Sequence, residues 1–141
     1  MQLHRSSGVL MHVSSLYGSD SIGGFGQEAR EFIDFLADCG FGWWQVLPFC
    51  MSDEYNSPYK SFSAFGGNPY FVDIRRLREE ELLSAAEVEA VRETTPFSAE
   101  YGYLYRTRLD LLRRAAERTD AAERARVAAF MTDNPYLAQF C

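Results

Sequence analysis

Two short apolar runs stand on either side of a segment with helical periodicity, and this order constrains the fold more than any other feature. The first run is Gly8 to Val13 and the second is Trp43 to Pro48. Gln27 to Asp38, between them, predicts an amphipathic helix with one apolar face, formed by Ala29, Phe32, Ile33 and Leu36. Strand, helix and strand in this order predict a right-handed βαβ unit with parallel strands buried on both faces.

The segments that follow the two predicted strands leave the sheet at the same edge, because parallel strands share their carboxyl ends. In α/β proteins this edge carries the functional site. We therefore expect the loops after Val13 and after Leu47 to face one another. Trp43 and Trp44 lie inside the second predicted strand and are interpreted as core residues.

The composition changes near residue 75. Nine of the ten glycines and 14 of the 21 aromatic residues precede this position, whereas the remainder is rich in Ala, Glu, Arg and Leu. We expect strands and loops over residues 1–75 and helices over residues 76–141. No stretch is polar and rich enough in Gly and Pro to predict an interdomain linker, so residues 1–141 are expected to belong to one domain.

Three helices are predicted in the second half. A capping box of Ser84 and Glu87 opens the first, which extends to about Glu93. The next is predicted over Tyr101 to Arg118, with an apolar stripe of Tyr105, Leu109, Leu112 and Ala116. The last begins after Asp120 and ends near Asn134.

Charge and hydropathy exclude several classes of partner. The net charge is −6 and Lys60 is the only lysine, which argues against a nucleic acid as partner. The longest apolar stretch is far shorter than the ~20 residues of a membrane span, so no membrane partner is expected. The N-terminal residues show no secretory signal, and a cytoplasmic location is therefore expected. Nothing in the sequence predicts an oligomeric state.

The sequence predicts no metal site. Three cysteines and two histidines lack the spacing of metal ligands, and the cysteines are expected to be reduced. The glycines of Ile22 to Gly26 fit no phosphate-binding pattern and are interpreted as a structural turn. His12, at the end of the first strand, fits two interpretations equally: a proton carrier or hydrogen-bond donor in a site, and a satisfied histidine in the core or at its rim. Asp53 and Glu54 are interpreted as a solvated loop tip rather than a catalytic pair.

The segment from Phe49 to Tyr70 predicts a binding loop. It is longer than the ~12–15 residues of ordinary connections, and its six aromatic residues count against disorder. Aromatic rings alternate with amides and hydroxyls, a pattern typical of carbohydrate sites, where rings lie against the apolar faces of sugars. The other interpretation, that the aromatic residues anchor the loop on the protein, stays open on physical grounds.

Several blocks of the sequence resemble the amylomaltases, the 4-alpha-glucanotransferases of glycoside hydrolase family 77. They are GVLMHVSSL, SIGGFGQEAREFIDFLADCG, WWQVLPF, NSPYKSFSAFGGNPYFVDI and YRTRLDLLRRA, in the family's order. The resemblance covers nearly the whole chain. It implies an α/β fold, namely the first βαβ unit of a (β/α)₈ TIM barrel, with a long aromatic loop and a helical insertion over about residues 76–141.

The same resemblance implies that 1,4-alpha-glucan segments move between maltodextrins by a retaining double displacement, with no cofactor. Tyr59 corresponds to the tyrosine lining the donor subsite beside the bond that breaks, and Ser57 lies next to it. Asn56, Lys60 and Asn68 complete the expected substrate contacts. The family's catalytic carboxylates come from later strands, so no catalytic residue is expected in this segment. We expect an amino-terminal fragment that is inactive alone, since such a barrel needs at least ~250 residues.

Departures from the family pattern lie in the loop. Asn56 replaces an aspartate, Lys60 replaces a glutamine, and MSDEYN stands where a turn like PTGYGD is common. These changes leave the subsite preference open. Two other hypotheses remain: a non-catalytic glucan-binding module that kept the aromatic loop, and a structural relic with all its aromatic residues buried.

Overall fold

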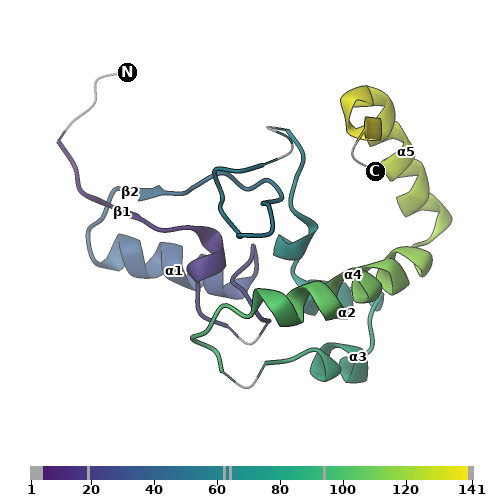
Figure 1. Ribbon diagram of the computed structural model, residues 1–141, viewed down its shortest axis with the longest axis horizontal. Helices are drawn as coiled ribbons and strands as arrows, with labels where there is room; N and C mark the ends of the chain where they lie inside the picture. Colours follow the sequence, from purple (N-terminus) through teal and green to yellow (C-terminus); the bar gives the residue numbers. More distant parts are fainter. Residues whose placement is uncertain (1–4, 19, 62, 64, 94, 140–141) are drawn as a thin grey trace.

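The computed structural model describes residues 5–18, 20–61, 63, 65–93 and 95–139. Two strands and the helix between them form one end of the molecule, and helices form the other (Figure 1). The elements in chain order are β1 Gly8–Leu10, the 3₁₀ helix η1 Val13–Ser15, α1 Gln27–Asp38, β2 Trp43–Gln45, the 3₁₀ helix η2 Pro69–Phe71, α2 Ile74–Glu79, α3 Ala85–Ala90, α4 Tyr101–Glu117, α5 Ala121–Asp133 and the 3₁₀ helix η3 Pro135–Gln139.

The strands β1 and β2 pair in parallel, with Gly8 opposite Trp43 and Leu10 opposite Gln45. Both are shorter than predicted. A Cβ atom on Gly8 would lie 2.6 Å from the carbonyl oxygen of Trp43, so the close pairing requires glycine here. Met11 N–H extends the ladder by donating to the carbonyl of Gln45 at 3.0 Å.

The strand side chains are not buried on both faces as predicted. Leu10 is 59% exposed and Trp43 is 54% exposed, because a sheet of two strands is too narrow to enclose its own faces. The interpretation of Trp43 as a core residue is therefore wrong for this chain. Trp44 does pack inward: its ring lies 5.0 Å from that of Phe32, and its Nε1–H donates to the carbonyl of Met11 at 2.9 Å.

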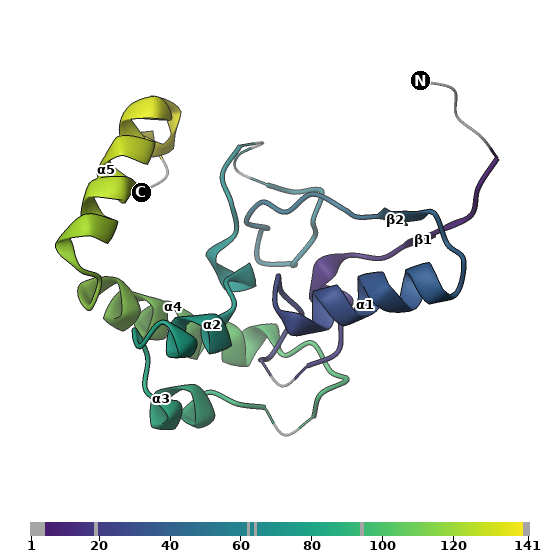
Figure 2. The same cartoon turned by 180° about the vertical axis from the view of Figure 1, so that it is seen from behind.

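The helix α1 has the predicted bounds and lies along the two strands (Figure 2). Ala29 and Leu36 are buried and Phe32 is half-buried, as its periodicity predicted. Ile33 departs from the prediction, since 52% of its surface is exposed. The narrow sheet accounts for this difference, because it covers only part of the apolar face of α1.

The glycines before α1 allow close backbone approach, which agrees with their interpretation as a structural turn. A Cβ atom on Gly23 would lie 2.2 Å from the carbonyl oxygen of Val13, and one on Gly24 would lie 3.1 Å from that of Phe71. Gly23 N–H also donates to the carbonyl of Ser14 at 3.0 Å. This turn therefore packs against η1 on one side and η2 on the other.

The second half is helical as expected, with three differences. The six-residue helix α2 was not predicted, and α3 ends three residues before the predicted Glu93. The buried stripe of α4 is also displaced by one residue from the predicted one, and consists of Leu104, Arg108, Leu111 and Ala115. The observed stripe contains an arginine, which apolar periodicity does not place in a core.

The helix α4 connects two buried clusters. The first joins η1, the glycine turn, α1 and η2 to α4, and consists of Val13, Leu16, Ile22, Ala29, Tyr70, Phe71 and Leu104. The second joins α2 and the segment after it to α4, and consists of Ile74, Leu83, Leu111 and Ala115. Since α4 packs in both clusters, it fixes the front of the chain relative to the helices α2 and α3.

Arg108 stabilises this junction. It is only 3% exposed and donates to the carbonyl oxygens of Asp20 at 2.6 Å and Val72 at 3.4 Å. Arg75 pairs with the carboxylates of Asp20 at 3.4 Å and Glu28 at 2.6 Å. Burial lowers the pKa of Arg108 and raises that of Asp20, an effect that the neighbouring arginines oppose for the carboxylate.

Replacing Gly23 by alanine is expected to destabilise the fold. The new Cβ atom would meet backbone atoms of Val13 and Leu16, which cannot move aside as a flexible side chain can. The cost is about 1–3 kcal/mol or more, read from urea unfolding. Gly67→Ala is the matched control, because a Cβ atom at Gly67 has no neighbour within 4 Å among the described residues. Equal stability of the two variants would contradict the packing described here.

Glu87 gives a pH dependence with a defined sign. Its hydrogen bonds to Arg118 (2.8 Å), and those to Ser84, lower its pKa from 4.5 to about 2. A depressed folded pKa gives stability that is fully present above pH 4.5 and is lost as the pH falls towards 2. Glu87→Gln is expected to reduce the acid dependence of the urea midpoint in this window. Glu89→Gln serves as the control, and an identical response of both variants would refute this assignment.

Candidate functional site

The long loop leaves the carboxyl end of β2 and folds back on itself between residues 52 and 61. Ser52 and Ser61 form an antiparallel bridge, and Asp53 N–H donates to the carbonyl of Lys60 at 3.1 Å. Within the turn, Lys60 N–H donates to the carbonyl of Ser57 at 3.1 Å. Residues 52–61, here called loop 52–61, therefore form a locally closed hairpin and not an extended segment.

The Asp53 carboxylate organises loop 52–61. Its Oδ1 accepts hydrogen bonds from the backbone N–H groups of Tyr55 at 3.1 Å and Ser57 at 3.5 Å. Its Oδ2 lies 3.7 Å from Nζ of Lys60. The side chain of Asp53 is only 18% exposed, so its prediction as part of a solvated tip is wrong. Glu54 is exposed, as expected for a residue at a solvated loop tip.

The aromatic residues divide into two groups. Tyr55, Tyr59 and Phe65 are each more than 70% exposed. Tyr70 and Phe71 are buried in the first core cluster, so they anchor the end of the long loop. The anchoring interpretation therefore applies to Tyr70 and Phe71, whereas carbohydrate binding stays a prediction for the exposed rings. Phe62 lies outside the described residues. The exposed rings are the ones that a sugar can contact, because stacking needs an accessible ring face.

The ammonium group of Lys60 lies against the exposed ring of Tyr55. Nζ of Lys60 is 5.5 Å from the centre of the Tyr55 ring, within the range of a cation–π contact. The ammonium group therefore lies near both a carboxylate and an aromatic face. Lys60 remains exposed and able to donate to a ligand.

The two candidate asparagines have their side-chain oxygens engaged. Oδ1 of Asn68 accepts from Tyr70 N–H at 3.0 Å and caps η2. Oδ1 of Asn56 accepts from the hydroxyl of Tyr105, a residue of α4. The amide nitrogens of both can donate to a ligand. Ser57, between Asn56 and Tyr59 in the chain, is half-buried.

Tyr105 is a residue that the sequence did not indicate. Its position in the predicted apolar stripe of α4 suggested a core residue, whereas it is 39% exposed and reaches loop 52–61. Because the buried stripe of α4 lies one residue away from the predicted stripe, Tyr105 lies outside the core and reaches loop 52–61. The burial of Leu104, Arg108, Leu111 and Ala115 shows this displacement.

His12 joins the two loops at the sheet edge. Its Nδ1 lies 2.7 Å from Oγ of Ser14, and its Nε2 lies 3.2 Å from the carbonyl oxygen of Pro48. The ring also packs edge-on against Phe71 at 5.6 Å. With both ring nitrogens partnered, the structure favours the satisfied rim histidine over the proton carrier. The contact to Pro48 joins the segment after β1 to the segment after β2.

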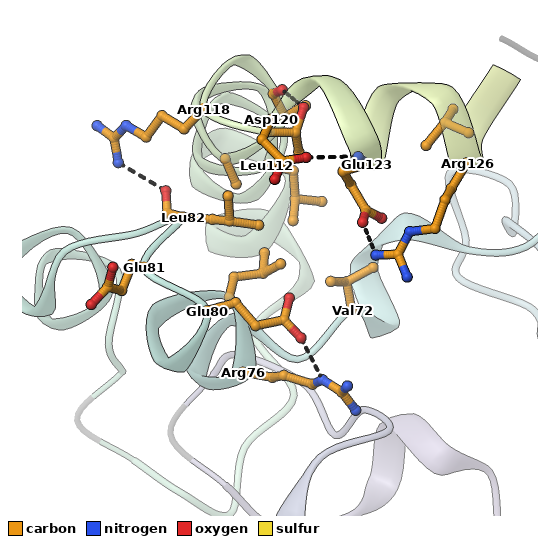
Figure 3. Close-up of a pocket in the computed structure, with 15 residues that line it drawn as sticks. Val72, Arg76, Glu80, Glu81, Leu82, Leu112, Arg118, Asp120, Glu123 and Arg126 are labelled. Carbon is orange, nitrogen blue, oxygen red and sulfur yellow. Dashed lines mark hydrogen bonds and ion pairs between the residues drawn. The ribbon is translucent and has the colours of Figure 1, made fainter.

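One groove lies away from loop 52–61. It has a volume of about 840 Å³ and lies between α2, α4 and α5, with Val72 and Leu112 at its wall (Figure 3). Ion pairs line it, such as Arg76 with Glu80 at 2.9 Å. No described residue of loop 52–61 contributes to the groove, so it is separate from the candidate site. Across the part of the chain that the structure describes, no three His, Cys, Asp or Glu residues gather as metal ligands.

A family model described as 4-alpha-glucanotransferase, glycoside hydrolase family 77, matches residues 11–141. The chain belongs to this family. The 4-alpha-glucanotransferase of Streptococcus pneumoniae serotype 4 is 45% identical over 115 residues, which are 81% of this chain and 23% of that protein. The enzyme of the same name from Thermus thermophilus is 36% identical over 92% of this chain and 26% of its own length.

A solved structure agrees with this membership. The amylomaltase from Streptococcus agalactiae in complex with acarbose superimposes with a TM-score of 0.86 at 31% identity. The match covers 97% of this chain and 28% of that one. The chain thus spans about a quarter of the length of the family members that it matches. Among the helices of the described residues, none has the length and hydrophobicity of a membrane span.

Proposed function

We propose that these residues belong to a 4-alpha-glucanotransferase that moves 1,4-alpha-glucan segments between maltodextrins by a retaining double displacement. The observation that carries the proposal is the exposed ring of Tyr59, 73% accessible on a closed loop at the carboxyl end of β2, in a chain of this family. This edge is where parallel α/β barrels bind their substrates. The acceptor would be a second maltodextrin.

Each residue of the proposed contact set has a defined chemical role. The ring of Tyr59 lies against a glucose ring, and the hydroxyl of Ser57 pairs with a sugar hydroxyl. Lys60 donates through its ammonium group, while Asn56 and Asn68 donate through their amide nitrogens, because their oxygens are engaged. No cofactor takes part in this scheme.

Retaining transfer also needs a nucleophile and an acid/base about 5–5.5 Å apart. We assign neither role to the residues of this chain, and we propose that later barrel strands supply them. In this scheme residues 1–75 form the first βαβ unit and the binding loop of a (β/α)₈ barrel. Residues 76–141 form a helical insertion in the same domain. The segment alone is then inactive, and the whole protein acts in the cytoplasm on starch- or glycogen-derived chains.

Replacing Tyr59 by alanine in the full-length protein tests the proposal. Glucose release from maltotriose, measured as transfer proceeds, is expected to show kcat/KM lowered about tenfold or more, because the ring's contact with sugar is lost; a factor of ten is ~1.4 kcal/mol. Phe97→Ala is the matched control, since Phe97 is an aromatic residue that is 88% exposed outside the loop. Equal loss in both variants would count against a role of Tyr59 in binding.

The alternative, a non-catalytic glucan-binding module, rests on the same exposed loop. It predicts that the parent protein binds maltoheptaose, seen by calorimetry, yet releases no glucose from maltotriose. Binding that disappears in Tyr59→Ala without any transfer in the parent would establish this alternative. Transfer in the parent would exclude it.

A further inference from the structure

The hydroxyl of Tyr105, on α4, contacts loop 52–61 at two residues: Asn56, which is 49 positions away in the chain, and Ser52. The hydroxyl of Tyr105 donates to Oδ1 of Asn56. Loop 52–61 otherwise closes on itself through the Ser52–Ser61 bridge and the Asp53 carboxylate. The bond to Tyr105 therefore relates the position of the whole hairpin to the core that α4 builds.

Asn56 has a backbone conformation that suits this contact. Its φ angle is 58°, in the left-handed region that asparagine enters more readily than most residues. Asn56 N–H donates to the carbonyl of Asp53 at 3.0 Å, which fixes the turn from the inside. The residue comes three positions before Tyr59, so a movement of Asn56 is transmitted directly to that ring.

The ring of Tyr105 packs against two other tyrosine rings. Its centre lies 5.1 Å from that of Tyr70, which is only 8% exposed, and 6.1 Å from that of Tyr101. Burial raises the pKa of Tyr105, so its hydroxyl stays protonated and able to donate at neutral pH. A fixed ring with a protonated hydroxyl is a rigid support for a loop.

We propose that Tyr105 is a positioning residue: by donating to Asn56 it holds loop 52–61 against α4, so that Tyr59 meets the glucan in one orientation. The inference rests on the proposed function. It assigns to the helical half of the chain a direct part in shaping the binding loop. Tyr105 acts through Asn56 and need not contact the sugar.

The first test measures the loop itself and does not depend on activity. Lysyl endopeptidase cleaves after Lys60 only when loop 52–61 opens, so the cleavage rate of the native full-length protein, followed by mass spectrometry, reports that opening. Tyr105→Phe is expected to raise this rate about 2- to 10-fold, as the loss of one hydrogen bond implies. Tyr103→Phe is the matched control: its lost hydroxyl donates instead to the carbonyl of Ala90, at 3.2 Å.

A double-mutant cycle identifies the partner. Asn56→Gly keeps the left-handed backbone but removes the acceptor, so Tyr105→Phe should have a smaller effect in that background, where only the contact with Ser52 remains to be lost. Asn56→Asp retains an acceptor and should restore the dependence on Tyr105. An undiminished effect of Tyr105→Phe beside Asn56→Gly would overturn the proposal, as would cleavage of Tyr105→Phe at the parent rate.

The second test asks whether the bond serves binding. Tyr105→Phe is expected to raise KM for maltotriose about 2- to 10-fold while kcat changes little, and this rise should be smaller beside Asn56→Gly. Faster cleavage with an unchanged KM would refute the positioning role. A parent protein without transfer would instead refute the proposed function, and the cleavage experiment would still decide whether Tyr105 holds the loop.

Discussion

The burial of Arg108 is the constraint on which the rest of the structure depends. Arg108 is only 3% exposed, and its buried guanidinium group needs partners, since an unpaired charge in the interior costs several kcal/mol, on the order of what holds a small domain together. The carbonyl groups of Asp20 and Val72 accept its hydrogen bonds. Asp20 belongs to the segment before the glycine turn, and Val72 follows η2. One side chain of α4 thus fixes both ends of the region that carries the candidate site.

This arrangement explains how a chain with two short strands can present an ordered loop. The loop ends at Tyr70 and Phe71, which are buried beside Leu104 of α4. Its start is held by His12 through the carbonyl of Pro48. With both ends fixed and the middle closed by Asp53, the exposed rings occupy defined positions without being buried themselves. A binding surface needs such preorganisation, because ordering a flexible loop on binding reduces affinity.

Much of this could be predicted from the sequence, for physical reasons. The bounds of α1 and the capping residues of α3 and α5 follow from local patterns, namely periodicity and side-chain hydrogen bonds to the first turn. The close approach at Gly23 follows from the clustering of glycines. These signals lie within a few residues of what they determine.

What could not be predicted depends on partners distant in the chain. The periodicity of α4 does not show that Arg108 is buried, because its acceptors are 88 and 36 residues away. Once that arginine turns inward, the stripe moves by one residue and Tyr105 reaches Asn56. The exposure of Trp43 and Ile33 likewise depends on the width of the sheet and not on their own segments.

The most direct test of the account is a crystal structure of the full-length protein with acarbose bound. We expect a sugar ring against Tyr59, with loop 52–61 closed by Asp53 and its Asn56 still bonded to Tyr105. Tyr59 covered by side chains of the protein, with the sugar bound away from loop 52–61, would contradict the account.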